Sequence, residues 1–192
     1  VSYVISITKN IKKKIMYESL EQAKLFHNAN DNNWIGEALA EYKHEIKNVI
    51  DQKQPKSILD YGCGKAMFHK HFLKTLFKGM MVFCYDPAVK NFENKPDKEF
   101  DLTLCIDVME HVQEDKVDEV LKDLFSKTKF VFLTITCYEA IQKLPNGKNA
   151  HYTIKEPNWW KEKLKSYEGK YKVIFQEKRE RSKMVRNPDP TE

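Results

Sequence analysis

Three aspartates, Asp60, Asp86 and Asp107, each follow a short apolar run, and Gly62 and Gly64 come directly after the first of them. Glycines at this spacing allow backbone dihedrals that a Cβ forbids, and they let a ligand approach the main chain closely. A carboxylate near such a turn can accept hydrogen bonds from both hydroxyls of a ribose. The pattern indicates a nucleoside site, and an ordinary glycine turn of an α/β protein is the alternative. Met67 replaces the third glycine of the dinucleotide fingerprint, so a dinucleotide is not indicated.

A second group of residues, Glu110, His111 and His151, can do acid–base chemistry. A histidine can take a proton from a hydroxyl or an amine near neutral pH, which makes His111 and His151 the candidate catalytic residues. Glu110, His111 and His151 are also candidate ligands of a divalent metal, which would lower the pKa of an acceptor hydroxyl. The alternative is that Asp107 contacts the bound nucleoside or caps a helix, while Glu110 and His111 only pack at the start of that helix.

Short strands that alternate with helices must position these residues. Strands are expected at Ser57–Leu59, Met80–Tyr85, Phe100–Ile106 and Lys129–Thr136, and helices at 65–77 and 117–125. This order gives an α/β fold with a doubly wound, mostly parallel sheet, in which ligands lie at the carboxyl ends of the strands. Met80–Tyr85 is apolar throughout, which suits a strand buried on both faces. The segment 88–99 is too short for the usual helix and strand, so the third-strand region is compact and its strand is very short or absent.

Two motifs resemble those of class I, Rossmann-like methyltransferases that use S-adenosylmethionine (SAM). Residues 59–64 (LDYGCG) resemble their motif I, and residues 100–112 (FDLTLCIDVMEHV) resemble the fourth-strand motif of the ubiquinone-biosynthesis O-methyltransferase group and its small-molecule relatives. The resemblance implies SAM as the cofactor, with its amine near Asp60 and its ribose near Asp86. The cofactor-binding residues that it implies are Asp60, Tyr61, Gly62, Cys63, Gly64, Asp86, Pro87 and Asp107.

The same resemblance bears on the end of the chain and on metal binding. The last two strands of the family are antiparallel, and Tyr171–Phe175 with Ser182–Arg186 fits such a C-terminal hairpin. The run from Asp107 to His111, together with His151, is similar to the metal-binding residues of the small-RNA 2′-O-methyltransferases. Two departures from that pattern are that the first acid is Asp and that a single distal histidine is visible.

The remaining segments divide the chain into an extension, one domain and a tail. Residues 1–33 are expected to be an N-terminal extension, in which 16–33 form a loop or a short helix. Residues 34–187 are expected to be a single methyltransferase domain, and residues 188–192 a frayed tail. A helix that starts at Trp34 and ends before Pro55 is expected to pack against the sheet.

The segment 138–158 is long and without regular structure, which is typical of a functional loop, and we expect it to overhang the transferred methyl group. Three residues could cover the cofactor but are expected to pack in the protein: Tyr17, Trp34 and His44. Three aromatic residues can stack on a planar acceptor, Trp159, Trp160 and Tyr152, although adjacent tryptophans at a helix start are more often anchors in the core.

Composition limits the partners. The chain has 192 residues, a net charge of +5 and a pI near 8.8, which permits a nucleic-acid partner without requiring one. No apolar run has the length of a membrane span, and the first lysines follow the apolar start, unlike those of a secretory signal. The four cysteines form no CxxC pair, which favours reduced thiols and a cytoplasmic protein.

The expected function is methyl transfer from SAM to a hydroxyl or an amine of a small-molecule acceptor, since no separate recognition domain is visible. Two alternatives stay open: an RNA or nucleotide methyltransferase, and a SAM-binding subunit that supports an active partner without catalysis. The Asp/Asn-Pro-Pro-Tyr/Phe signature is absent, which argues against methylation of the exocyclic amines of DNA bases.

Overall fold

A parallel sheet forms the centre of the molecule. The structure is a computed structural model, and it describes residues 17–177 except residues 68 and 127. In this part of the chain the strand order is β2-β1-β3-β4-β5, and every pair of neighbours is parallel. The strands are β1 (Ser57–Tyr61), β2 (Met81–Tyr85), β3 (Leu102–Ile106), β4 (Val131–Thr136) and β5 (Tyr171–Gln176). The predicted α/β class with a parallel sheet is confirmed.

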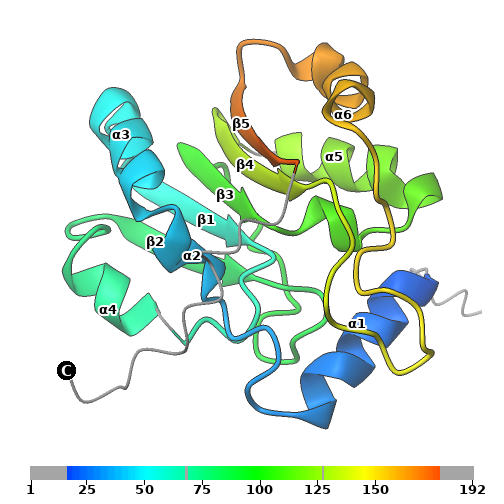
Figure 1. Cartoon of the computed structure of the whole chain (residues 1–192). Coiled ribbons are helices and arrows are strands. Elements are labelled where there is room, and N and C mark those ends of the chain that lie inside the picture. Colours follow the sequence, from blue (N-terminus) through cyan, green and yellow to red (C-terminus); the bar gives the residue numbers. More distant parts are fainter. Residues whose placement is uncertain (1–16, 68, 127, 178–192) are drawn as a thin grey trace, which may run out of the picture.

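Helices cover both faces of the sheet (Figure 1). The described α-helices are α1 (Glu18–Ala29), α2 (Ala38–Glu41), α3 (Lys43–Lys53), α4 (His69–Lys74), α5 (Val117–Phe125) and α6 (Pro157–Leu164). Short 3₁₀ turns lie at Met109–His111, Glu114–Lys116 and Lys165–Tyr167. Helices α2, α3 and α4 pack on one face, and α5 and α6 pack on the other, so the chain is doubly wound.

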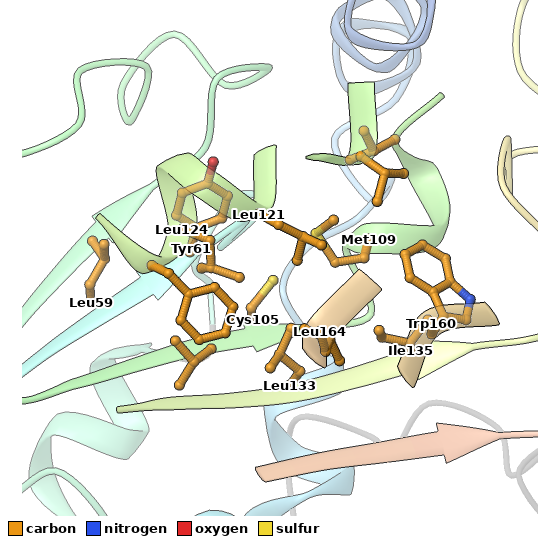
Figure 2. Packing of buried hydrophobic residues seen from close by; sticks show 14 of the residues in the cluster. Leu59, Tyr61, Cys105, Met109, Leu121, Leu124, Leu133, Ile135, Trp160 and Leu164 are labelled. Atoms are coloured by element: carbon orange, nitrogen blue, oxygen red, sulfur yellow. The ribbon is translucent and has the colours of Figure 1, made fainter. Parts of the chain in front are cut away.

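The two cores follow from the alternation of side chains along each strand. On β1, Ile58 belongs to the core beneath α2, α3 and α4, whereas Leu59 belongs to the core beneath α5 and α6. Trp160 is fully buried in the second core, in one cluster with Leu121 of α5 (Figure 2). Trp159 packs against the same cluster. The tryptophan pair therefore anchors α6 and is not placed to stack on an acceptor.

The described C-terminal end of the sheet is parallel, since strand β5 runs parallel to β4 along its whole length. The predicted antiparallel pairing of 171–175 with 182–186 stays a prediction. The chain passes through the segment 137–156 and α6 before it enters β5, and a long crossover with a helix gives a parallel pair. Its predicted hairpin partner, 182–186, lies outside the described residues, as do residues 1–16 and the tail 188–192.

Two further predictions are corrected between β1 and β3. Strand β2 is an edge strand and is not buried on both faces: Met81 is 55% exposed, because the described residues 88–99 form turns and no third strand covers β2. The helix predicted over 65–77 is limited to α4. Ala66 has a φ of +52°, a left-handed conformation that ends or delays an α-helix.

The N-terminal part contains a longer helix than expected, since α1 has 12 residues. The helix predicted to start at Trp34 begins instead at Ala38, because Trp34 and Gly36 have φ of +46° and +87°. None of the described helices combines the length and the apolar composition needed to cross a membrane.

Candidate active site

A cavity of about 410 Å³ opens at the carboxyl ends of the strands. Each strand contributes a residue at its end or directly after it: Tyr61, Asp86, Ile106, Thr136 and Gln176. Strand β1 has β2 on one side and β3 on the other, and ligands of open α/β sheets bind where the strand order reverses in this way. Both the place and the volume of the cavity are those of a small-molecule site.

The glycine turn after β1 forms one wall of the cavity. The N–H of Gly62 donates a hydrogen bond of 2.7 Å to the carbonyl of Tyr85, which holds the turn against the end of β2. Gly62 and Gly64 have φ of +80° and +56°. A Cβ at Gly64 would lie 2.2 Å from the carbonyl oxygen of Trp34. Gly64 is therefore required by the close approach of the protein's own backbone, which the sequence did not reveal.

Asp86 lies directly after β2 and is 7% exposed. One carboxylate oxygen accepts a hydrogen bond of 2.9 Å from the N–H of Gly64, and the other accepts one of 2.8 Å from the N–H of Ala88. Burial raises the pKa of Asp86 to about 6, although these bonds oppose the rise. Each carboxylate oxygen has two lone pairs, so both can accept a further bond from a ligand hydroxyl. Asp86 and Pro87 line the cavity.

Asp60 and Cys63 lie behind the turn and are not among the described residues that line the cavity. Asp60 is buried, and its Oδ2 is 3.0 Å from Nε2 of His69 in α4, with a geometry unsuited to a hydrogen bond. Burial lowers the pKa of His69, but Asp60 and Cys84 outweigh burial and raise it to about 10. His69 is therefore positively charged near neutral pH and forms an ion pair with Asp60. A contact between Asp60 and the cofactor amine stays a prediction.

Asp107 lines the cavity at the end of β3, with a left-handed φ of +51°. Its N–H donates a bond of 2.9 Å to Oγ1 of Thr134, and that hydroxyl donates a bond of 2.5 Å to Oδ1 of Asp107. The following 3₁₀ turn begins after Val108 and has no side-chain cap. Asp107 is thus held at the carboxyl end of β3 and does not cap a helix.

Glu110 is fully buried, a rare place for a carboxylate. Its Oε1 accepts a hydrogen bond of 3.1 Å from the N–H of Thr136, and its Oε2 has no hydrogen-bond partner among the described residues. Burial, and then the charge of Asp107, raises the pKa of Glu110 well above its usual value. A carboxylate in this setting either keeps a proton or faces a cation.

His111 and His151 lie side by side, with ring centroids 5.0 Å apart. Nδ1 of His111 is 2.8 Å from the carbonyl of Ala150, and Nδ1 of His151 is 2.5 Å from the carbonyl of Tyr138. A carbonyl only accepts, so each Nδ1 carries a proton and the lone pair of a neutral ring is on Nε2. Burial, and then His151, lowers the pKa of His111 to about 3. Ligand atoms of Glu110, His111 and His151 all lie within 4.8 Å of one another, so the structure brings these three residues together.

Helix α1 forms a wall of the cavity that the sequence did not reveal. Leu20, Ala23 and His27 line the cavity from one face of α1. The ring of Trp34 lies between those of His27 and His111, at centroid distances of 5.2 and 4.6 Å. Trp34 and Tyr17 both line the cavity, so they are placed where they can contact a bound ligand. The spacing of residues 20, 23 and 27 was the one available signal, and the polar residues around them concealed it.

The loop 138–156 lies beside α1 (Figure 1), and polar contacts join the two. Lys148 forms an ion pair of 2.7 Å with Glu18, and the N–H of Asn146 donates a bond of 2.9 Å to Oε1 of Gln22. Parts of this loop line the cavity, as expected of a functional loop. The loop and α1 therefore enclose the cavity together.

The charge of the cavity wall is one-sided. The described residues that line it include no Lys or Arg, and its acids are Glu37, Glu41, Asp86, Asp107 and Glu110. Such a wall favours a ligand that is positive or neutral over one that is negative.

Because the imidazole of His27 is buried, we expect the folded protein to lose stability in acid. His27 is 4% exposed, and burial, followed by the charge of Lys65, lowers its pKa to about 4. An unfolded histidine titrates near pH ~6.5, so the unfolded state gains a proton first and stability falls from about pH 6.5 to about pH 4. Between about pH 7.5 and about pH 5, the unfolding free energy of His27→Gln should therefore fall by about 1–2 kcal/mol less than that of the wild type.

Urea unfolding at these two pH values measures the effect. Asp86 and Glu110, whose pKa values are raised, act in the opposite sense, so the informative quantity is the difference between variant and wild type. His71→Gln, at an exposed position of α4, is the matched control and should keep the pH dependence of the wild type. Equal pH dependence in His27→Gln and the wild type would contradict the prediction.

The glycine turn after β1, the acid after β2 and the cavity at the reversal of strand order together define a Rossmann-like fold of the nucleoside-binding class. The methyltransferase domain family matches residues 34–174. The chain belongs to this family, and α1 lies outside the matched region.

One solved structure of similar fold is the 1,6-didemethyltoxoflavin-N1-methyltransferase of Burkholderia thailandensis, with bound 1,6-didemethyltoxoflavin and S-adenosylhomocysteine. Its TM-score is 0.50 and its sequence identity 16%, over 77% of this chain and 76% of that chain. At this identity the likeness concerns the fold alone. A comparison with curated proteins finds no match.

Proposed function

We propose that this chain is a SAM-dependent methyltransferase that acts on a hydroxyl or an amine of a small molecule. The observation that carries the proposal is the cavity bounded by the glycine turn and by the buried carboxylate of Asp86, in a chain of the methyltransferase family. The neighbour of similar fold holds S-adenosylhomocysteine and 1,6-didemethyltoxoflavin, which supports both the cofactor and a small acceptor. The similarity of residues 100–112 to the ubiquinone-biosynthesis O-methyltransferases favours a hydroxyl, and it rests on sequence alone.

The residues present fit SAM. Asp86 would accept the ribose hydroxyls, the turn of residues 61–64 would lie against the cofactor, and Asp107 would contact it from the end of β3. The acidic wall without described Lys or Arg suits a cofactor that carries a sulfonium and an ammonium. SAM supplies a methyl group that its positive sulfur already activates. The chain's own residues must therefore align the acceptor and receive its proton.

An acceptor panel tests the proposal. The full chain is incubated with SAM and sets of small hydroxyl compounds, small amines and total RNA, and S-adenosylhomocysteine is measured by mass spectrometry. We expect product with at least one small-molecule set and none with RNA. Methylation of RNA would show that the acceptor is RNA and not a small molecule. Tight binding of SAM without product in any set would support a non-catalytic subunit instead.

We assign to His151 the role of the general base that takes the proton from the acceptor, and His111 lies beside it. The carbonyl of Tyr138 fixes the His151 ring, and the loop that carries it encloses the cavity. We expect His151→Ala to reduce turnover by about 10²- to 10⁴-fold, the usual contribution of a general base, while the Kd for S-adenosylhomocysteine changes less than about twofold. His71→Ala, at an exposed position of α4, should keep full turnover. Full turnover in His151→Ala would remove this role.

In a second arrangement, which replaces the role of His151 as a base, Glu110, His111 and His151 would hold a divalent metal. Oε2 of Glu110 has no hydrogen-bond partner in the part of the chain that the structure describes. Nδ1 of each histidine donates to a carbonyl, the usual arrangement around a metal-bound imidazole. Two nitrogens and one carboxylate oxygen suit Zn²⁺ with a fourth position left for an acceptor oxygen, whose pKa the metal would lower. The two imidazoles then act as ligands rather than as bases.

Metal content checks this assignment. After equilibration with Zn²⁺ and gel filtration, elemental analysis should find one metal per wild-type chain. Glu110→Gln should bind Zn²⁺ at least about tenfold more weakly, because it removes the one anionic ligand. Glu37→Gln, which changes an acid of the same wall outside the cluster, should bind Zn²⁺ like the wild type. Equal Zn²⁺ affinity in Glu110→Gln and the wild type would exclude the site.

A reducing compartment such as the cytoplasm is the proposed location, supported by the free state of Cys63, Cys84, Cys105 and Cys137.

A further inference from the structure

Two thiols, an imidazole and a carboxylate meet behind the glycine turn, on residues that do not line the cavity: Cys63, Cys84, His69 and Asp60. Cys84 of β2 stands opposite Asp60 of β1 in the register of the sheet. The N–H of Cys63 donates a bond of 3.2 Å to the carbonyl of Tyr85, the residue after Cys84. The sheet and the turn therefore hold the two cysteines next to each other.

The side chains of this cluster lie close together. The side chains of Cys63 and His69 lie close enough to Cys84 to act on its pKa. The thiol of Cys63 also donates a bond of 3.4 Å to the carbonyl of Gly64. His69 in turn lies 3.0 Å from Oδ2 of Asp60. A thiol beside an imidazole that forms an ion pair with a carboxylate is in a setting that activates a sulfur nucleophile.

The charges around Cys84 favour its thiolate. The neighbouring thiol of Cys63 lowers the pKa of Cys84, burial opposes this, and His69 lowers it further, to about 6. The interaction with Cys84, followed by burial, raises the pKa of Cys63. Asp60 is the other charged group that acts on Cys84 and works against the thiolate. At neutral pH, Cys84 is therefore the attacking sulfur and Cys63 the protonated partner.

We propose that Cys84 and Cys63 form an oxidisable dithiol that reacts with peroxides. The thiolate of Cys84 attacks one oxygen of hydrogen peroxide, which breaks the O–O bond and gives a sulfenic acid and hydroxide. The sulfur of Cys63 then displaces the oxygen of the sulfenic acid, which leaves as water, and an S–S bond forms. Overall two thiols lose two electrons and two protons, and one peroxide becomes two waters.

Two observations separate this role from the alternatives. The group of described residues with metal-ligand spacing is Glu110, His111 and His151, and it includes neither cysteine. Cys84 lies on the edge strand β2 and is half-buried, which places it nearer to solvent than Cys63, which is buried. The inference does not depend on the proposed methyl transfer.

Peptide mapping tests the dithiol. The reduced full chain is treated with hydrogen peroxide near neutral pH, its remaining thiols are alkylated, and it is digested with trypsin. We expect the peptides 57–65 and 79–90 to appear joined, two hydrogens lighter than their sum and separable by dithiothreitol, while Cys105 and Cys137 are alkylated. Recovery of both peptides alkylated and unjoined, at a peroxide dose that oxidises exposed methionines, would overturn the proposal.

The pH profile of alkylation tests the activation of Cys84 by itself. In the wild type the rate at Cys84 should rise with a midpoint near pH 6, and His69→Gln should move that midpoint upward by one pH unit or more. Cys63→Ser should form no joined peptide and should leave a Cys84 sulfenic acid that dimedone traps. Cys137→Ser is the matched control and should react like the wild type. A midpoint at or above that of an ordinary thiol, near ~8.5, would contradict the inference.

Discussion

The Gly64→Ala variant is expected to lose measurable binding of S-adenosylhomocysteine and roughly 2–5 kcal/mol of unfolding free energy. The added Cβ would lie 2.2 Å from the carbonyl oxygen of Trp34, and the residue would need a φ of +56°. The left-handed conformation alone costs about 1–2 kcal/mol. The clash adds to this cost because the obstructing atom belongs to the backbone. That carbonyl also accepts a bond of 3.1 Å from the N–H of Lys65, so its displacement would open the turn.

Gly79→Ala is the matched control for this prediction. Gly79 has a similar φ of +82°, and a Cβ there would meet nothing within 4 Å. This variant should lose only about 1–2 kcal/mol and should bind S-adenosylhomocysteine like the wild type. Urea unfolding and calorimetric titration measure the two effects. Equal losses in both variants would show that the contact with Trp34 does not matter.

The Asp86→Ala variant should bind S-adenosylhomocysteine about 1–3 kcal/mol more weakly, roughly 5- to 150-fold in Kd. It removes the carboxylate assigned to the ribose and, with it, the acceptors for the N–H groups of Gly64 and Ala88. Asp86→Asn keeps one oxygen acceptor and should fall between Asp86→Ala and the wild type. Calorimetric titration of folded variants, checked by circular dichroism, gives the three affinities. Unchanged affinity in Asp86→Ala would remove this residue from the site.

The raised pKa of Asp86 gives the same prediction a pH signature. The carboxylate of the free protein is protonated below about pH 6, and only the charged form gives the strong bond to a ligand hydroxyl. Affinity in the wild type should therefore be level above about pH 7 and should decline below about pH 6, by up to about tenfold per unit. Asp86→Asn, which has no group that titrates there, should lack this decline. A level profile for the wild type would contradict the assigned contact.

The sequence was sufficient for the parts of the site that depend on local pattern. Apolar runs that end in Asp60, Asp86 and Asp107 marked three strand ends, and parallel strands place such ends at one edge of the sheet. His111 and His151 are far apart in the chain, and the structure brings them to ring contact because the loop that carries His151 returns to the turn after β3. There the N–H of Thr153 donates a bond of 3.0 Å to the carbonyl of Glu110.

Other features depend on packing between distant segments, which local pattern does not encode. β2 is partly exposed because no strand in the described 88–99 covers its edge. Ala66 and Trp34 take left-handed conformations where the backbones of their two segments are in close contact, and no residue preference predicts this. His27 reaches the cavity only because α1 lies across the strand ends, outside the matched family region.

Calorimetric titration of S-adenosylhomocysteine into the full wild-type chain near neutral pH is the most direct measurement of what the cavity binds. Saturable binding of one molecule per chain is the expected result, lost in Gly64→Ala and kept in Gly79→Ala. Absence of binding by the folded wild type, or equal binding by these two variants, would contradict a cofactor site at the turn after β1.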